Sequence, residues 1–123
     1  RPTLDIDAVV KVGDLTETAV NDVFALAPFG FGNPSPLFAI MDAQVAAAPQ
    51  IIKEKHMRIR VEQNRRWMSA IGWRLAERSA EVEPGQRIDL AVSIEEDAYS
   101  AAQGYAGWSA VLKDFSTRPI EIE

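Results

Sequence analysis

Residues 56–73 read HMRIRVEQNRRWMSAIGW, and this stretch decides the fold. In its first half polar and apolar residues alternate strictly, which is typical of a half-buried β-strand over residues 56–62. The polar run 63–66 predicts a hairpin turn, and residues 67–73 form the return strand, in which Gly72 predicts a bulge or a close backbone approach. The alternation sends Met57, Ile59 and Val61 inward and His56, Arg58, Arg60 and Glu62 outward.

Three further β-strands are expected around this hairpin. Residues 37–45 form the first strand, and the fourth and fifth cover residues 88–94 and 108–115. Residues 74–80 predict a short helix, which the turn Glu83-Pro84-Gly85-Gln86 separates from the fourth strand. Five strands with a short helix between the third and the fourth is the order of the OB-fold, a small and partly open barrel. We therefore predict a mainly β, five-stranded OB-fold barrel with one short helix.

A strand and a helix precede this barrel. Residues 4–10 begin by alternating apolar with acidic residues, and Gly13 ends the strand. Asp14 is placed to cap a helix, with Glu17 three residues later. The apolar face of that helix comprises Val20, Val23, Phe24 and Ala27.

Residues 28–36 contain two glycines and three prolines, which exclude both a helix and a central strand. We expect an irregular elbow, with Phe29 and Phe31 holding it against the core. A glycine-rich phosphate loop is the sharper alternative, but no Lys-Ser/Thr pair follows. We place the domain boundary here, with a lead-in over residues 1–36 and the OB domain over residues 37–123.

The composition is that of one ordinary globular domain: 123 residues, 47% apolar and 25% charged. The absence of cysteine excludes disulfides, thiolate metal sites and a cysteine nucleophile. No apolar run approaches the roughly 18 residues needed to cross a membrane, and no signal peptide opens the chain, so we expect a cytoplasmic protein without a membrane partner. The opening Arg1-Pro2-Thr3 leads us to expect a fragment of a longer protein.

Charge is distributed unevenly along the chain. The net charge is −5, which argues at first sight against a polyanionic partner. Between Ile51 and Arg78, however, the sequence contains eight basic and three acidic residues, so that this window carries a net charge of +5. Such asymmetry predicts an electropositive face on an acidic body, although a solvated surface with incidental charge stays an alternative.

On the OB template this positive window falls where ligands bind, across the second and third strands and the loops joining strands 1 to 2 and 4 to 5. Single-stranded nucleic acid needs cations for its phosphates and aromatic faces for its bases. The candidate nucleic-acid-binding residues are Lys53, Lys55, His56, Arg58, Arg60, Arg65, Arg66, Trp67, Tyr99 and Tyr105.

The tryptophans and the acidic run have alternative interpretations. Core filling and base stacking are equally supported for Trp67. A core position is favoured for Trp73, and a core position or a barrel lid for Trp108. His56 is the only histidine, and we expect it to contact a phosphate or to make one hydrogen bond. The carboxylates at residues 95–97 point in different directions along a strand, so we expect a solvated strand end and no divalent-cation site.

Several segments resemble one family. Residues 26–38, LAPFGFGNPSPLF, are similar to the L-x-PFGxGNPxPxF signature of RecJ single-stranded-DNA-specific exonucleases. Residues 55–59 resemble the family's KHLKL strand and residues 70–73 its AIGF segment. Residues 85–90 resemble its G-x-x-[VI]-DL strand and residues 112–115 its final [IL]-KD-[IF] strand. The matches follow the family's order over most of the chain.

The resemblance implies a role in 5′-to-3′ single-strand exonucleases of DNA repair and recombination. In that family a DHH domain binds Mn²⁺ or Mg²⁺ and performs catalysis, and a DHH-associated domain and the OB domain follow. Residues 1–36 then correspond to the end of the DHH-associated domain and its connection. Nothing in the chain matches the metal-binding motifs, so we expect no catalytic residue, metal ligand or cofactor in this fragment. The loop of residues 97–107 departs from the family, being longer and having Asp97 in place of Asn.

The resemblance implies single-stranded DNA as the partner, with a single-strand-binding protein and the other domains of the parent exonuclease as further candidates. The alternative function is a structural or protein-contact OB module that does not bind nucleic acid by itself.

Overall fold

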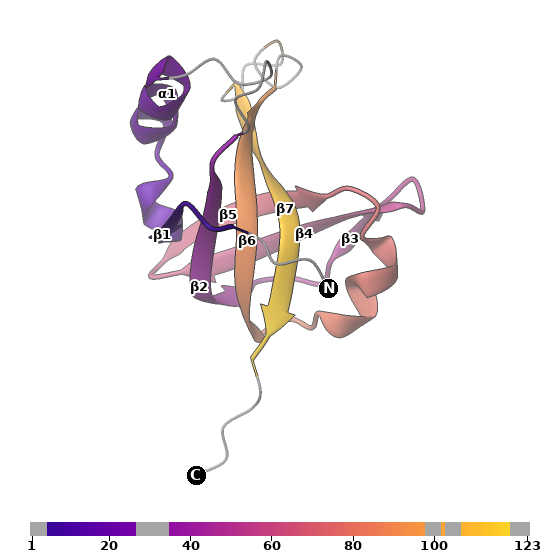
Figure 1. Ribbon diagram of the computed structural model, residues 1–123. Coiled ribbons are helices and arrows are strands. Elements are labelled where there is room, and N and C mark those ends of the chain that lie inside the picture. The colour runs from indigo at the N-terminus through magenta and orange to yellow at the C-terminus, as the bar shows by residue number, and fades with distance from the viewer. Residues whose placement is uncertain (1–4, 27–34, 98–101, 103–106, 119–123) are drawn as a thin grey trace.

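The computed structural model describes residues 5–26, 35–97, 102 and 107–118. Five strands form a closed ring in the order β2–β6–β7–β5–β4, and β4 returns to β2 (Figure 1). Their bounds are β2 Leu37–Val45, β4 His56–Gln63, β5 Arg66–Gly72, β6 Arg87–Glu96 and β7 Trp108–Thr117. The β5–β7 pair is parallel, and the other pairs of the ring are antiparallel. This ring confirms the predicted mainly β, five-stranded OB-fold barrel.

The alternation in β4 fills the barrel as predicted. Met57, Ile59 and Val61 are fully buried, and they belong to one core cluster with Ile40, Val45, Ile88, Leu90, Val92, Leu112 and Phe115. Burying an apolar side chain of this size contributes about 1.5 to 3 kcal/mol. A slip of one residue would turn all three β4 side chains to solvent, so the pattern fixes the register of the strand.

Two short strands extend the ring at its edges. β1 (Ala8–Val10) runs parallel to β2, and β3 (Gln50–Ile52) pairs antiparallel with β4. β3 was not predicted, because three residues give too short a period-2 signal. The turn after it also lacks the usual Asn-Gly pair: Lys53 and Glu54 adopt positive φ values of 52° and 61°.

The 3₁₀ helix η2 (Ala76–Glu81) occupies the predicted helical position between β5 and β6. Just before it, Leu75 packs directly over Gly72. A Cβ atom at residue 72 would lie 2.7 Å from Leu75 Cδ1, and the β4–β5 register runs without a shift. Gly72 therefore serves a close approach and does not form a bulge.

A bulge occurs instead in β2, where the pairing with β6 shifts between Ile40 and Ala43. Asp42 lies inside this shift with φ 58°. Its backbone N–H donates to Asp89 Oδ1 at 2.8 Å, and Arg118 Nη2 lies 2.7 Å from the same oxygen. Bulges bend strands, and β2 accordingly pairs with β1 along its first half and with β4 at its end.

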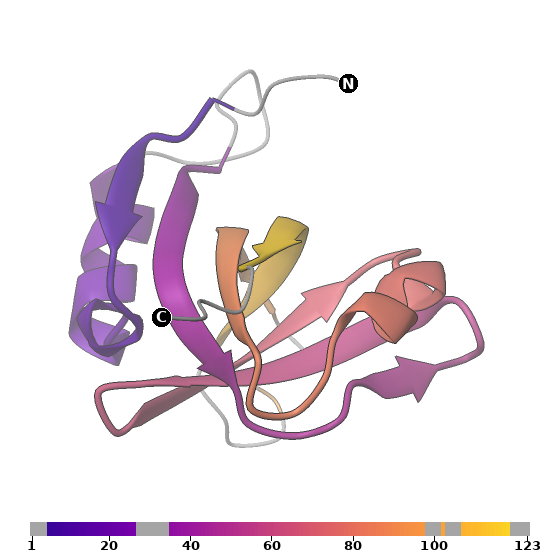
Figure 2. The same cartoon turned by 90° about the horizontal axis from the view of Figure 1, so that it is seen from below.

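The helix α1 (Glu17–Leu26) and β1 stand beside β2 on one side of the barrel (Figure 2). The predicted cap was wrong: Thr16 Oγ1 accepts the N–H of Ala19 at 3.1 Å and caps α1. Asp14 belongs instead to a 3₁₀ turn, η1 (Val12–Asp14), and accepts the N–H of Lys11 at 2.9 Å. Competing caps two residues apart are not separable from sequence alone.

Gln63 ties this lead-in to the barrel. Its Oε1 accepts the N–H of Val12 at 2.9 Å, and its Nε2 donates to the carbonyl of Met41 at 2.7 Å. Val12 is itself buried in the core cluster. The division at residue 36 stays a prediction, and residues 8–15 contribute to the packing of the barrel.

Replacing Gln63 by alanine should lower the free energy of unfolding by about 1 to 2 kcal/mol, because the partly buried N–H of Val12 and the exposed carbonyl of Met41 both lose their partner. Urea denaturation measures the change. Gln50→Ala is the control: Gln50 is exposed on β3, and its loss should change stability by less than about 0.5 kcal/mol. Equal stability of the Gln63→Ala variant and the parent would contradict the bridging role.

Candidate nucleic-acid interface

The outward faces of β4 and β5 form one continuous surface. The two strands pair in register over their whole length, with Arg58 opposite Ile71, Arg60 opposite Ser69 and Glu62 opposite Trp67. Both Arg58 and Arg60 are exposed, as the alternation predicted. This surface therefore combines cationic and aromatic side chains on adjacent strands.

Trp67 and Trp73 stand at the two ends of this surface. Their side chains are 57% and 56% exposed, so the favoured core position for Trp73 was wrong. The inward positions of β5 are taken by Met68 and Ala70, which belong to the core. Residues 67–73 carry apolar side chains on both faces, so the sequence did not define which face is buried.

An open groove of about 510 Å³ lies along β5 between these tryptophans. Trp73 follows Trp67 by six residue steps along an extended chain, so the two positions are separated by about 20 Å. The groove is lined by Leu15, Ile52, Arg58, Trp67, Met68, Ser69, Ala70, Ile71, Trp73, Asp97, Trp108, Ser109 and Ala110. Trp108 is half-buried and packs against the core, as predicted.

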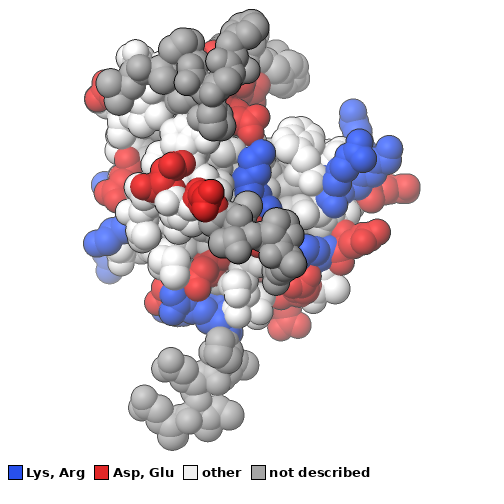
Figure 3. Space-filling view, in the orientation of Figure 1, with Lys and Arg blue, Asp and Glu red and all other residues white. Residues whose placement is uncertain are grey.

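The remaining predicted cations lie in the two turns that flank the strand pair. Lys53 and Lys55 are exposed beside the β3–β4 turn, near the Trp73 end, and Figure 3 shows Lys and Arg side chains gathered at this hairpin with acidic ones next to them. Arg65 and Arg66 are exposed at the β4–β5 turn, near the Trp67 end. The structure thus places a cationic turn at each end of the groove.

One acidic residue, Glu62, lowers the cationic character of the β4–β5 surface. Glu62 lies opposite Trp67, and its Oε1 accepts the N–H of Arg65 at 3.1 Å. Arg65 itself adopts φ 63°, the left-handed conformation of a tight hairpin turn. The carboxylate of Glu62 therefore supports the turn that presents Arg65 and Arg66.

His56 lies at the Trp73 end of the groove and is half-buried. Its Nδ1 accepts the backbone N–H of Arg74 at 2.9 Å. Its ring meets the ring of Trp73 edge to face, with centroids 4.9 Å apart and an interplanar angle of 79°. His56 thus makes the single hydrogen bond that was one of its two predicted roles.

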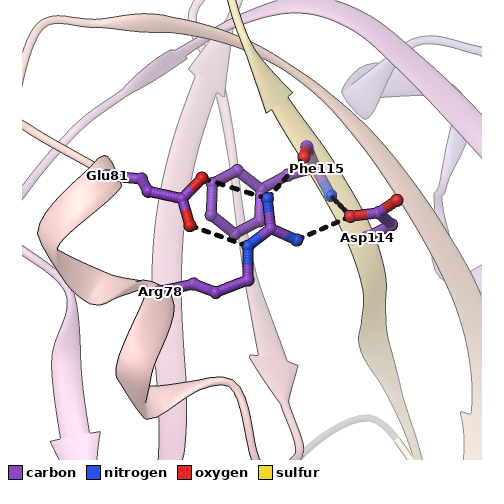
Figure 4. A network of polar contacts seen from close by, with 4 residues as sticks. All are labelled: Arg78, Glu81, Asp114 and Phe115. Atoms are coloured by element: carbon purple, nitrogen blue, oxygen red, sulfur yellow. Dashed lines mark hydrogen bonds and ion pairs between the residues drawn. The ribbon is translucent and has the colours of Figure 1, made fainter. Parts of the chain in front are cut away.

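Arg78, counted in the positive window, lies outside this surface. Its guanidinium connects η2 to β7 (Figure 4): Nη1 lies 2.6 Å from Asp114 Oδ1, Nε lies 2.9 Å from Glu81 Oε2, and Nη2 donates to the Phe115 carbonyl at 3.0 Å. Its Cζ lies 4.0 Å from the centroid of the Phe115 ring. Hydrogen bonding to Glu81 raises the pKa of Arg78 above its ordinary value. The sequence analysis counted Arg78 in the charge of this window without proposing it as a binding residue, and the fold assigns it to a structural network.

Part of the predicted site is outside the described residues. Tyr99 and Tyr105 belong to this part, as does most of the signature at residues 26–38. Near the end of β6, before the loop of residues 97–107, Glu95 Oε2 lies 3.5 Å from Lys113 Nζ. Among the described residues no three His, Cys, Asp or Glu side chains gather into a group that could hold a metal ion.

Sequence reasoning did not predict that segments outside the second and third barrel strands would line the groove. Leu15 belongs to the lead-in and Ile52 to β3, and neither segment was expected beside the binding strands. Trp108 was expected in the core or as a barrel lid, and it also lines the groove. The helices among the described residues are all too short or too polar to cross a membrane.

Known structures with this arrangement are OB-folds at low sequence identity. A replication protein A heterotrimer bound to ssDNA matches with a TM-score of 0.50 and 11% identity, covering 68% of this chain and 58% of that one. An aspartyl-tRNA synthetase from Leishmania major matches with a TM-score of 0.53 and 9% identity, covering 89% of this chain and 20% of that one. These likenesses support the fold.

Sequence relatives identify the family. The single-stranded-DNA-specific exonuclease RecJ of Bacillus subtilis is 26% identical over 90 residues, which are 72% of this chain and 12% of that protein. The chain thus spans a small part of that relative's length. The family model described as the RecJ OB domain matches residues 6–105. The chain therefore belongs to the RecJ OB domain family.

Proposed function

We propose that this domain binds single-stranded DNA in the groove along β5 and presents it to the nuclease of a RecJ-type 5′-to-3′ exonuclease in DNA repair and recombination. The observation that carries the proposal is the pair of exposed tryptophans, Trp67 and Trp73, at the two ends of one groove. Solvent-exposed tryptophans are costly to hydrate unless a partner covers them.

Single-stranded DNA matches both parts of this surface. Its bases stack on aromatic rings with little sequence preference, and its phosphates need cations alongside. Arg58 and Arg60 lie on β4, next to the strand that carries the tryptophans. Lys53, Lys55, Arg65 and Arg66 extend the cationic track beyond each end of the groove, and about 20 Å of strand accommodates several nucleotides.

The parent enzyme supplies the chemistry in this proposal. Mn²⁺ or Mg²⁺ belongs to its DHH domain, the OB domain contributes affinity, and the whole enzyme works in the cytoplasm. The partners are single-stranded DNA and the neighbouring domains, with a single-strand-binding protein as a further one.

The decisive experiment is a titration of labelled single-stranded and double-stranded oligonucleotides with the domain, followed by anisotropy at several salt concentrations. Arg58→Ala combined with Arg60→Ala should flatten the dependence of log K on log salt by about 1.4, since each phosphate contact on a single strand contributes about 0.7. At about 0.1 M salt this corresponds to a roughly 10- to 30-fold loss of affinity.

The matched control removes two charges elsewhere. Arg87→Ala with Lys113→Ala neutralises one exposed cation on β6 and one on β7, and neither residue lines the groove. This control should retain nearly the whole salt slope. An arginine variant that binds as tightly as the parent would show that β4 does not line the DNA path.

A second candidate function is a protein-contact module. A separate open groove of about 430 Å³ lies on another face and is lined partly by Ile6, Met41 and Phe115. Ile6 and Met41 are 40% and 43% exposed. Failure of single-stranded DNA to bind even at low salt would favour this function, with the parent's other domains as the contact partners.

A further inference from the structure

His56 connects the backbone after β5 to the aromatic ring at the end of the groove. Its Nδ1 accepts the N–H of Arg74, and its ring contacts Trp73, the residue directly before Arg74. An imidazole nitrogen that accepts a hydrogen bond carries no proton. The observed geometry therefore requires the neutral imidazole with its proton on Nε2.

We infer that neutral His56 is a positioning residue, which holds Trp73 in place for stacking, and that protonation of His56 releases Trp73. The inference rests on the proposed function, because the position of Trp73 affects affinity only if a base stacks on it. It differs from the sequence-based expectation of a phosphate contact, in which a protonated His56 would strengthen binding.

The backbone at Arg74 explains why one hydrogen bond matters here. Arg74 adopts φ 61°, a left-handed conformation that is unfavourable for a residue with a side chain. The acceptor on His56 stabilises this turn, and the turn sets the direction in which the chain leaves Trp73. A protonated imidazole would oppose N–H to N–H, so the turn would lose its acceptor and the ring contact its geometry.

The surroundings of His56 carry mixed charge. Across β3 its register partner is Ile52, which does not titrate. The charged residues of the β3–β4 turn, of the segment after β5 and of η2, together with Arg58 on β4, are Lys53, Glu54, Lys55, Arg58, Arg74, Glu77, Arg78 and Glu81. Among these, Arg78 and Glu81 bind each other.

The free protein provides the first test. With 5-fluorotryptophan at the three tryptophan positions, fluorine NMR resolves each ring, and Trp67→Phe and Trp73→Phe assign the signals. Between about pH 8 and pH 5.5 we expect the Trp73 resonance to follow the titration of the imidazole while the Trp67 resonance stays fixed. A Trp73 resonance that ignores pH would overturn the inference.

Two variants separate the hydrogen bond from the ring contact. His56→Asn keeps an acceptor near the position of Nδ1 and loses the titration, so Trp73 should become insensitive to pH. His56→Phe keeps a ring and loses the acceptor, so the Arg74 amide should lose protection from hydrogen exchange at every pH. Unchanged Arg74 protection in His56→Phe would contradict the role of the hydrogen bond.

Binding of oligothymidine, whose bases do not titrate here, completes the test. We expect affinity to fall about three- to tenfold between pH 8 and pH 5.5, the range that loss of one hydrogen bond produces. Trp73→Ala and His56→Asn should both abolish this decrease. Affinity that rises on acidification, with the rise lost in His56→Asn, would establish a phosphate contact and overturn positioning.

The two proposals fail in different ways. If oligothymidine does not bind at any pH while the Trp73 resonance still titrates with His56, the coupling of the two side chains stands and the proposed DNA binding falls. If oligothymidine binds and Trp73 is insensitive to pH and to both His56 variants, DNA binding stands and the positioning role falls.

Discussion

Replacing Trp67 and Trp73 together by alanine should weaken binding of single-stranded DNA by about 30-fold to roughly 20,000-fold. Each base stacked on an aromatic side chain contributes about 1 to 3 kcal/mol, and the two rings lie too far apart to share one base. Both side chains are more than half exposed, so their loss should leave the barrel folded. Anisotropy titration at one fixed salt concentration measures the effect, and circular dichroism verifies the fold.

Two sets of variants make this prediction specific. Trp67→Phe and Trp73→Phe keep a smaller ring and should each retain most of the affinity. Val9→Ala with Met41→Ala removes two other exposed apolar side chains, 69% and 43% accessible, away from the groove. Binding by the double tryptophan variant at the parental level would exclude the groove as the stacking site.

Replacing Arg78 by methionine should destabilise the domain by about 2 kcal/mol and lower its melting temperature by roughly 5 to 10 °C. The variant loses the bonds to Asp114, Glu81 and the Phe115 carbonyl together with the cation–π contact. The partial exposure of the side chains, 27% for Arg78 and 33% for Asp114, keeps the effect below that of a buried ion pair. Calorimetry measures the change.

The charge of Arg78 gives this contribution a flat pH profile. A raised pKa means that the folded state favours the protonated guanidinium. Its contribution is therefore complete below the ordinary pKa of arginine and declines only as the pH rises above it, far from neutrality. The stability difference between parent and Arg78→Met should stay constant between about pH 6 and pH 9.

Controls for Arg78 separate stability from binding. Glu77→Ala alters an exposed residue of the same 3₁₀ helix and should change stability by less than about 0.5 kcal/mol. Below its melting temperature, Arg78→Met should bind single-stranded DNA like the parent, in contrast to the Arg58 and Arg60 variant. A large loss of affinity with unchanged stability would show that Arg78 belongs to the binding surface.

The sequence predicted much of the barrel because several of its strands have one buried face. The alternation of Met57, Ile59 and Val61 with charged residues fixed both the strand and its orientation, and Arg58 and Arg60 are exposed as that pattern required. Turn residues and the short helix between β5 and β6 supplied the order of elements. Every second residue of such a strand is buried, so the buried positions can be predicted from the sequence of the strand alone, without knowing its partner strands.

The tertiary structure decided what the periodic pattern left open. Trp73 and Ile71 share a face on which either burial or exposure fits the sequence, and only the core volume taken by Met68 and Ala70 turns the tryptophans outward. Arg78 lies in the same positive window as Arg58, yet the fold brings its guanidinium to Asp114 of β7. The contact of His56 with Arg74 and Trp73 joins residues 17 and 18 positions apart. Local patterns determined which side chains face into or out of each strand. Which outward side chains form a groove was determined by contacts between distant segments, because the closure of the barrel decides which strands become neighbours.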